Sequence, residues 1–207
     1  LDAPYLFDES DDLFYVAHHT DFDHLTTLTL SAWMYASPNT TGNANIIVCK
    51  NATTDSATHR PWSLEYNQVD GGSIRFASGN ATSSDVVISA SQIPLGTWAH
   101  VAATFNDSSN TVKIYINGVL DQTDSSFNIT PNQTSSGDRS VSIGGLYSND
   151  STAGDLFEGS IADVRVYNTD LGATDVAVLA SKINSDINLG AGTTNMRSHW
   201  ALINGSP

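Results

Sequence analysis

The sequence predicts an all-β protein in which two antiparallel sheets pack face to face and one short helix lies near the C-terminal end. Short segments of alternating apolar and polar residues recur along the chain, and Gly-, Ser-, Thr- and Asn-rich connections separate them. Many short strands at such spacing are typical of a β-sandwich. The strands are expected at residues 12–17, 27–36, 45–50, 62–66, 73–77, 85–89, 97–105, 111–116, 119–123, 140–144 and 156–167.

Residues 96–121 show this pattern most clearly. In the expected strand 97–105, Val101 and Phe105 belong to an apolar side, and the other side is mixed. A polar turn and a second alternating segment follow, and that segment ends at Asn117-Gly118, the strongest short-range signal for a hairpin turn. The region therefore predicts two consecutive hairpins.

The same region carries a resemblance to a known family. The segments that carry it are WAHVAATF and KIYING. Two further segments belong to the same resemblance, TLTLSAWMYA at residues 27–36 and FEGSIADVRVYNTDL at residues 157–171. Together these segments resemble the laminin-G-like jelly rolls of the concanavalin A-like lectin and glucanase superfamily, over about residues 6–180. The resemblance implies a jelly-roll sandwich, and it is weak for function because one fold hosts many activities.

The expected domain organisation follows from length and from this resemblance. Residues 1–182 are predicted to form one laminin-G-like jelly-roll domain, with a helix over 174–182 where apolar residues recur at near-helical spacing. Residues 183–196 are expected to be a linker, and residues 197–207 an extra C-terminal strand.

The predicted core is apolar and contains no disulfide. Cys49 is the sole cysteine and lies in an apolar run, so we expect a buried, inert thiol, with an exposed thiol for intermolecular pairing as the alternative. Trp98 is also interpreted as a core residue. The other expected core residues are Trp33, Val101, Phe105, Ile114, Ile116, Ile161, Val164 and Val166.

Composition excludes some classes of partner. The chain of 207 residues has a formal net charge of -14, which disfavours binding to nucleic acid or anionic lipid through a basic surface. No apolar run reaches the roughly 20 residues that a membrane-spanning helix needs. The first residue is Leu1 and no basic-apolar leader follows, which fits a mature secreted chain or a trimmed one, and we expect a secreted or cell-surface location.

Sequons for N-glycosylation support the same expectation. Eight N-x-S/T sites are present, and nearly all fall in expected turns between strands, where a glycan would stand in water. The alternative is a polar loop composition without glycans. The candidate sites are Asn39, Asn51, Asn80, Asn106, Asn128, Asn132, Asn149 and Asn204.

The sequence predicts no catalytic site. Glycoside hydrolysis needs two carboxylates at a defined separation, and the resemblance implies that a hydrolase would carry E-x-D-x-x-E on one strand. The three glutamates, Glu9, Glu65 and Glu158, do not form that pattern. A Ser-His-Asp triad stays open because its members are distant in sequence, although no nucleophile elbow supports one. We therefore expect that the chain is not an enzyme.

Calcium is the expected metal. Jelly rolls of the resembled family often bind calcium between an early acidic turn and the late F-x-G-x-I-D-D strand, so the resemblance implies Asp11 or Asp12 together with Asp163 as ligands. Ala162 replaces the first Asp of that motif, and solvated carboxylates are the alternative. His18 and His19 are adjacent and are interpreted as part of a solvated loop rather than a metal cluster.

A ligand face is expected around Trp62, Tyr66, Asp70 and Asn80. Aromatic rings give sugars an apolar platform, and Asn or Asp side chains read their hydroxyls. Core packing is the alternative for at least one of the two aromatic residues. If this face binds, the expected partners are glycans or extracellular proteins, with calcium as an aid.

The C-terminal segment suggests a different function. Its sequence NMRSHWALINGS resembles the strand that usually opens a domain of this family, and that strand is missing at the start of this chain. Arg197, His199, Trp200 and Leu202 are therefore candidates to complete a sheet, either in the same chain or in a neighbouring subunit. Pairing between subunits would give a structural or adhesive glycoprotein that assembles head to tail, even into a filament. The lectin-like binding module is the alternative function.

Overall fold

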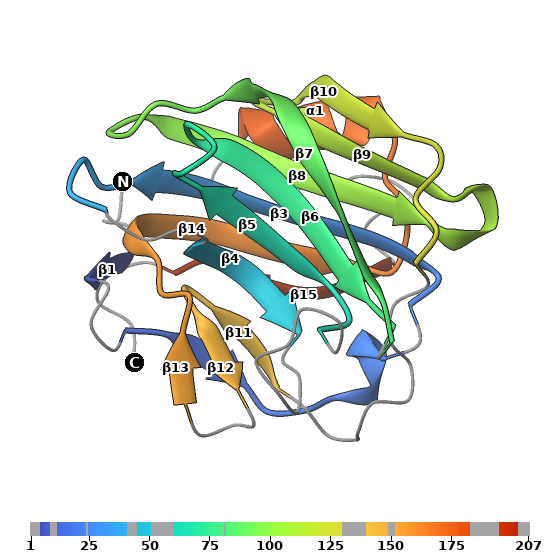
Figure 1. Ribbon diagram of the computed structural model, residues 1–207, viewed down its shortest axis with the longest axis horizontal. Coiled ribbons are helices and arrows are strands. Elements are labelled where there is room, and N and C mark those ends of the chain that lie inside the picture. The colour runs from blue at the N-terminus through green and yellow to red at the C-terminus, as the bar shows by residue number, and fades with distance from the viewer. Residues whose placement is uncertain are drawn as a thin grey trace.

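The computed structural model describes residues 5–8, 12–23, 25–40, 45–50, 60–80, 82–129, 140–148, 152–182 and 195–202. Within these residues the chain forms two large antiparallel sheets stacked face to face, as Figure 1 shows. The predicted sandwich is therefore confirmed.

The first sheet has seven strands. Six follow one another in hydrogen-bonded order, and β15 (Met196–Trp200) adds to β14 outside that order. The ordered strands are β1 (Tyr5–Asp8), β14 (Glu158–Tyr167), β3 (Thr27–Ala36), β8 (Trp98–Asn106), β9 (Thr111–Ile116) and β10 (Val119–Asp124).

The second sheet has six strands, and a small hairpin stands beside it. The six strands in order are β2 (Phe14–Val16), β11 (Val141–Ile143), β4 (Asn45–Lys50), β5 (Ser63–Asn67), β6 (Ser73–Gly79) and β7 (Ser84–Gln92). The hairpin consists of β12 (Leu146–Ser148) and β13 (Thr152–Gly154), within residues that the sequence predicted to be a connection. That prediction was wrong because a strand of three residues is too short to show an alternating pattern.

The expected helix is present as α1 (Ala173–Ser181), which begins one residue earlier than predicted. Its residues Val176 and Leu179 pack on Ala102 and Tyr115 of the seven-stranded sheet. The helix thus covers part of the outer face of that sheet. No helix in the described ranges is long and apolar enough to cross a membrane.

The core lies between the two sheets. Phe76 of the six-stranded sheet stacks on Phe105 of the seven-stranded sheet, with ring centroids 6.1 Å apart, and Phe127 packs against both rings. The predicted core residues Val101, Phe105, Ile114, Ile161, Val164 and Val166 are all buried, and Ile116 is half-buried against them.

Trp33 and Trp98 were predicted to be core residues, and the structure places both outside the core. The core side of β3 and β8 is filled by residues such as Met34 and Val101, so the strand period of two directs both tryptophans to the outer face of the sheet. Trp98 is 39% exposed, and Trp33 is half-buried.

The first and last strands, β1 and β15, pair with the same edge of β14. Strand β1 pairs with the first part of β14, up to Ile161, and β15 pairs with the second part, from Val164 onward. The amide of Tyr5 donates to the carbonyl of Leu202 at 2.9 Å, which joins the two short strands end to end. The C-terminal segment therefore completes its own sheet, as in one of the two arrangements that the sequence left open.

Candidate functional site

The two outer faces of the sandwich differ. Helix α1 covers part of the seven-stranded sheet, whereas the outer face of the six-stranded sheet has no helix among the described residues. In Figure 1, β4, β5 and β6 lie in front of β14 and β3, so the reader looks onto this second face. Several charged side chains, among them Arg60, Glu65 and Arg75, lie on this face and do not contribute to the core between the sheets.

Strand register brings these side chains into one row. Glu65 on β5 lies opposite Arg75 on β6, and Arg75 lies opposite Ile88 on β7. Residues on either side of them, such as Leu64 and Phe76, point into the core. We call this surface the arginine face and define it as Arg60, Glu65, Arg75, Ala77, Val86 and Ile88.

Arg60 and Glu65 form a buried ion pair within the arginine face. The Arg60 Nη1 donates to Glu65 Oε1 at 2.8 Å, and the Ser63 hydroxyl donates to the same oxygen at 2.6 Å. Arg60 Nη2 also lies 3.3 Å from Oδ2 of Asp155, the residue that follows β13. Burial alone would lower the pKa of Arg60, but the negative charges of Cys49 in its ionised form and of the two carboxylates raise it, so the guanidinium stays charged.

Arg75 is the second cation of the arginine face. Its side chain is half-buried, and its Nε is fully buried without a hydrogen-bond partner. The structure gives Arg75 no ion pair with any described residue, although Glu65 lies opposite it in the strand register. The carboxylate opposite Arg75 in the strand register is thus already engaged by Arg60 and Ser63 through Oε1.

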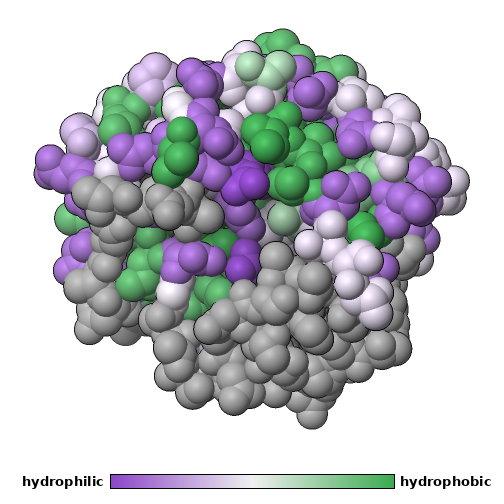
Figure 2. Space-filling view, in the orientation of Figure 1, coloured by the Kyte–Doolittle hydropathy of each residue, from purple (hydrophilic) through white to green (hydrophobic). Residues whose placement is uncertain are grey.

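Apolar surface borders these charges. Ile88 is 37% exposed, Val86 is half-buried on the same strand, and Ala77 is half-buried opposite Val86 on β6. Figure 2 views this side of the molecule and shows hydrophobic surface over β7 next to strongly hydrophilic surface. Charged donors and acceptors next to an apolar patch are the usual composition of a ligand site.

Cys49 lies on β4, on the same outer face of the six-stranded sheet, under the β12–β13 hairpin. It packs with Ile46 and Leu146, and its Sγ lies 3.3 Å from the Ser142 hydroxyl. Burial raises the pKa of the Cys49 thiol to about 11. The predicted buried thiol is therefore confirmed, and this geometry gives it no nucleophilic role.

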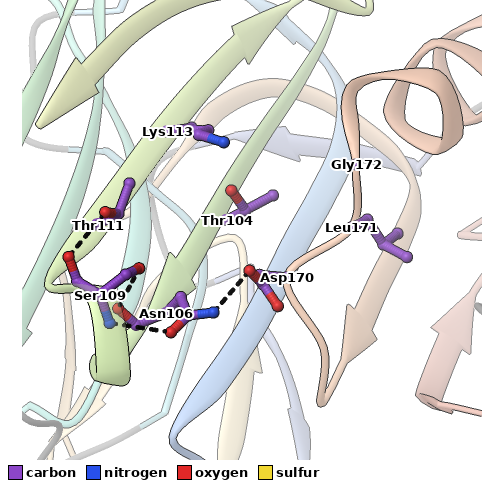
Figure 3. Close-up of a pocket in the computed structure, with 8 residues that line it drawn as sticks. All are labelled: Thr104, Asn106, Ser109, Thr111, Lys113, Asp170, Leu171 and Gly172. Carbon is purple, nitrogen blue, oxygen red and sulfur yellow. Dashed lines mark hydrogen bonds between the residues drawn. The ribbon is translucent and has the colours of Figure 1, made fainter. Parts of the chain in front are cut away.

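A second candidate is a polar pocket of about 260 Å³ on the outer face of the other sheet. As Figure 3 shows, β8, β9 and the segment before α1 line it. Asn106 Nδ2 donates to Asp170 Oδ2 at 2.8 Å across the pocket, and Lys113 forms no ion pair with a described residue. No aromatic side chain lines this pocket, so it offers no platform for a sugar ring.

The aromatic residues of the predicted ligand face are core residues instead. Trp62 and Tyr66 are buried, and the Tyr66 hydroxyl donates to the carbonyl of Ile93 at 3.0 Å. They point inward because the strand period directs Ser63 and Glu65 outward. Of the predicted group, Asp70 is exposed in the turn after β5, and Asn80 is half-buried in the turn after β6.

Further aromatic rings lie on the outer face of the seven-stranded sheet. Trp98 lies against Tyr35 with ring centroids 5.7 Å apart, and Trp33 lies edge-on to His100. Burial lowers the pKa of His100 to about 4, so its imidazole is neutral at physiological pH. No charged side chain belongs to these two ring contacts, and we rank this surface below the arginine face.

The expected calcium ligands are not brought together as a cluster. Asp163 is buried, and Arg165 and His199 engage its carboxylate. The Tyr5 hydroxyl donates to Asp12 at 3.5 Å, and Asp11 lies outside the described residues. Among the described residues no group of three or more His, Cys, Asp or Glu side chains could hold a metal ion, and calcium binding stays a prediction.

The His18 segment is not simply solvated. His18 Nε2 lies 2.8 Å from Asp23, and Lys50 bonds the same carboxylate at 2.7 Å. Burial alone would raise the pKa of Asp23, but Lys50 and His18 lower it below its ordinary value of 3.8. This half-buried ion pair ties the segment after β2 to β4.

Four of the sequons lie within the described residues. Asn39 and Asn128 are exposed, whereas Asn80 and Asn106 are half-buried and engaged in turns. The remaining candidates, Asn51, Asn132, Asn149 and Asn204, lie outside the described residues.

Sequence reasoning missed the arginine face. The signal was the alternation in residues 73–77, which places Arg75 between two core residues, Ile74 and Phe76, on a strand otherwise made of small or apolar residues. The second partner of Arg60 could not be found this way, because Asp155 is 95 positions further along the chain.

Comparisons with known proteins agree with the β-sandwich fold. A family model described as "Concanavalin A-like lectin/glucanases superfamily" matches residues 8–177. No curated protein matches the sequence.

Solved structures with this fold come from several kinds of protein. A candidate carbohydrate binding protein of Bacteroides ovatus superposes with a TM-score of 0.68 at 14% identity, covering 99% of this chain and 53% of that one, so this chain spans about half its length. A heptameric SAP-like pentraxin of Limulus polyphemus gives a TM-score of 0.66 at 16% identity, covering 97% and 91%. The CBM40 module of the Ruminococcus gnavus IT-sialidase, bound to alpha2,3 sialyllactose, gives 0.63 at 14% identity, covering 82% and 97%.

Proposed function

We propose that this chain, which belongs to the concanavalin A-like lectin/glucanase superfamily, is a non-catalytic carbohydrate-binding module whose ligand face is the arginine face. The observation that carries the proposal is the juxtaposition of Arg75, without an ion pair among the described residues, with Glu65 on a sheet face that no described helix covers. Similar folds occur in a candidate carbohydrate binding protein and in a CBM40 module, which supports this class of function.

The arrangement can bind a sugar through three kinds of contact. The Arg75 guanidinium can donate to hydroxyl or carboxylate oxygens, and Glu65 Oε2, which bonds no described residue, can accept from a hydroxyl. The exposed side chain of Ile88 can pack against the apolar face of the ring. The ion pair with Arg60 holds Glu65 in place, so little ordering is needed on binding.

A glycosidase mechanism fits the face less well. Glycosidases place two carboxyl groups on opposite sides of the scissile bond. Here Glu65 and Asp155 are bonded to the same guanidinium of Arg60. This arrangement favours a binding role, in line with the expectation from sequence.

The proposed setting is extracellular. The candidate sequon residues Asn39 and Asn128, which are exposed, support secretion and glycosylation. Calcium is proposed only as an aid, since the contacts of the arginine face need no metal.

Head-to-tail assembly by strand donation is the other function that the sequence suggested. The C-terminal strand β15, which includes His199 and Trp200, pairs with β14 of its own chain, so the edge that a donated strand would occupy is filled. We propose the binding module as the function of the single chain.

A glycan array tests the proposal directly. The wild-type chain, with and without a chelator, is compared with Arg75→Ala and with Lys113→Ala, which removes an equivalent charge from the pocket on the opposite sheet. We expect a defined set of bound glycans, about tenfold weaker binding after Arg75→Ala and no change after Lys113→Ala, because a charge-assisted hydrogen bond is worth about 1.5 to 3 kcal/mol. If Lys113→Ala is the variant that loses binding, the pocket is the site instead. An array without any bound glycan contradicts the function.

A further inference from the structure

We infer that the arginine face selects glycans that carry a carboxylate and that Arg75 is the residue that recognises it. This inference rests on the proposed function and names its ligand class. It starts from the way that the other buried cations of this chain are neutralised.

Each fully buried cation among the described residues has a carboxylate partner. Lys50 bonds Asp23 at 2.7 Å, Arg60 bonds Glu65 at 2.8 Å, and Arg165 bonds Asp163 at 2.8 Å. A buried charge without such a partner is costly, which explains the pairing. The chain has 22 acidic and 8 basic residues, so carboxylates are abundant enough to supply every cation with one.

Arg75 departs from this rule. Its Nε is buried and has no hydrogen-bond partner, and the structure records no ion pair for its guanidinium with any described residue. Lys113 also forms none, but its nitrogen is not among the buried polar atoms without a partner. A buried donor without a partner is unfavourable, and the Nη atoms of Arg75 are not among the buried atoms without a partner, so a ligand group would reach this guanidinium through them.

The chemistry of that group follows from the guanidinium. Its planar fork matches a carboxylate with two parallel hydrogen bonds, which a sugar hydroxyl cannot offer. Glu65 cannot supply the carboxylate through the oxygen that already accepts from Arg60 and Ser63. A ligand carboxylate on Arg75 would leave Glu65 Oε2 to accept from a neighbouring hydroxyl of the same sugar.

The acidic character of the whole chain does not prevent this contact. A net charge of -14 repels anions at long range. Salt screens such repulsion beyond about 8 Å at physiological ionic strength, whereas a half-buried pair at contact distance is screened much less. Selectivity would therefore come from Arg75 itself and not from the overall field.

Paired ligands test the inference. Isothermal titration calorimetry compares sialyllactose with lactose, and a hyaluronan tetrasaccharide with its carboxyl-reduced form. The first pair represents terminal acidic sugars, and the second represents uronates within a polysaccharide. We expect at least one acidic ligand to bind about 10- to 100-fold more tightly than its neutral partner.

Variants then assign the preference to one residue. Arg75→Gln should abolish the preference for the acidic ligand, Arg75→Lys should keep part of it, and Lys113→Gln should leave it unchanged. Thermal unfolding of each variant shows whether the fold is intact. Equal binding of acidic and neutral ligands by the wild-type chain, or a preference that survives Arg75→Gln, overturns the inference and leaves carbohydrate binding standing. Failure to bind any of the four glycans, together with an array on which no glycan is bound, overturns both.

Discussion

His199 Nε2 lies 2.5 Å from Asp163 Oδ1, and this contact joins the C-terminal strand β15 to the middle of β14. Arg165 donates to the same oxygen from Nε at 2.9 Å. Asp163 lies at an irregularity of β14, has a φ of 54°, and lies between the residues of β14 that pair with the start of β1 and with the end of β15. The carboxylate that the family resemblance assigned to calcium therefore holds the C-terminal strand in place in this structure.

Removing this carboxylate should destabilise the fold. Asp163→Asn keeps the shape of the side chain but removes the charge that faces Arg165 and His199, so we expect the free energy of unfolding to fall by about 3 kcal/mol. Urea denaturation measures the change, and Asp70→Asn, in an exposed turn, is the control. Equal midpoints for the two variants would contradict the structural role of Asp163.

The same contact predicts how stability depends on pH. Burial alone would raise the pKa of Asp163, but the hydrogen bond from His199 and the charge of Arg165 lower it below its ordinary value of 3.8. A carboxylate with a lowered folded-state pKa contributes stability that is complete above the unfolded pKa and is lost as pH falls through the folded value. Urea midpoints of the wild-type chain should therefore drop below about pH 3.8, and Asp163→Asn should show a smaller drop.

The thiol of Cys49 should be unreactive in the folded protein. It is fully buried, and its pKa is raised to about 11, so both access and thiolate are lacking at neutral pH. Mass spectrometry after treatment with iodoacetamide at pH 8 should show no adduct without denaturant and one adduct in concentrated urea. Rapid modification of the native chain would show that the hairpin β12–β13 does not protect this residue.

Strand alternation predicted most of the fold, and its failures have identifiable causes. The strand Trp98–Asn106 was predicted to within one residue, and the buried side of that strand includes Val101 and Phe105 as expected. Trp98 was wrongly assigned to the core because its large apolar side chain was given more weight than the strand period of two. Trp62 and Tyr66 were assigned to a ligand face because they lie beside the loop that carries Arg60, although the period of two places them opposite Glu65 and therefore inward.

The candidate site was the part least accessible from sequence. Arg60, Glu65 and Asp155 meet only because β13 and β5 converge on one sheet face, and nothing local in the sequence signals a contact across 95 positions. The sequence likewise left open whether the C-terminal strand pairs within its own chain, and in this structure β15 pairs with β14 of the same chain.

A pair of aromatic substitutions separates core from surface. Phe105→Ala should cost about 3 to 5 kcal/mol of unfolding free energy, because the ring is buried between Phe76 and Phe127. Trp98→Ala should cost about 1 kcal/mol or less, since the indole is partly exposed on the outer face. Urea denaturation of both variants checks the assignment. A larger loss of unfolding free energy for Trp98→Ala than for Phe105→Ala would show that Trp98 is a core residue.

Truncation after Asn195 tests how the C-terminal strand is used. Strand β15 pairs with β14, and Trp200 stacks on Phe22 with ring centroids 6.3 Å apart, so removal of the segment exposes an apolar edge and takes His199 away from Asp163. We expect the full-length chain to have the mass of a monomer, 22.0 kDa, by light scattering, and the truncated chain to unfold at much lower urea concentration. The double variant His199→Ala and Trp200→Ala keeps the backbone pairing and should lie between the two. Assemblies of the full-length chain that disappear on truncation while the core stays folded would instead show that the strand is donated to a neighbour, because only pairing between chains makes assembly depend on this segment.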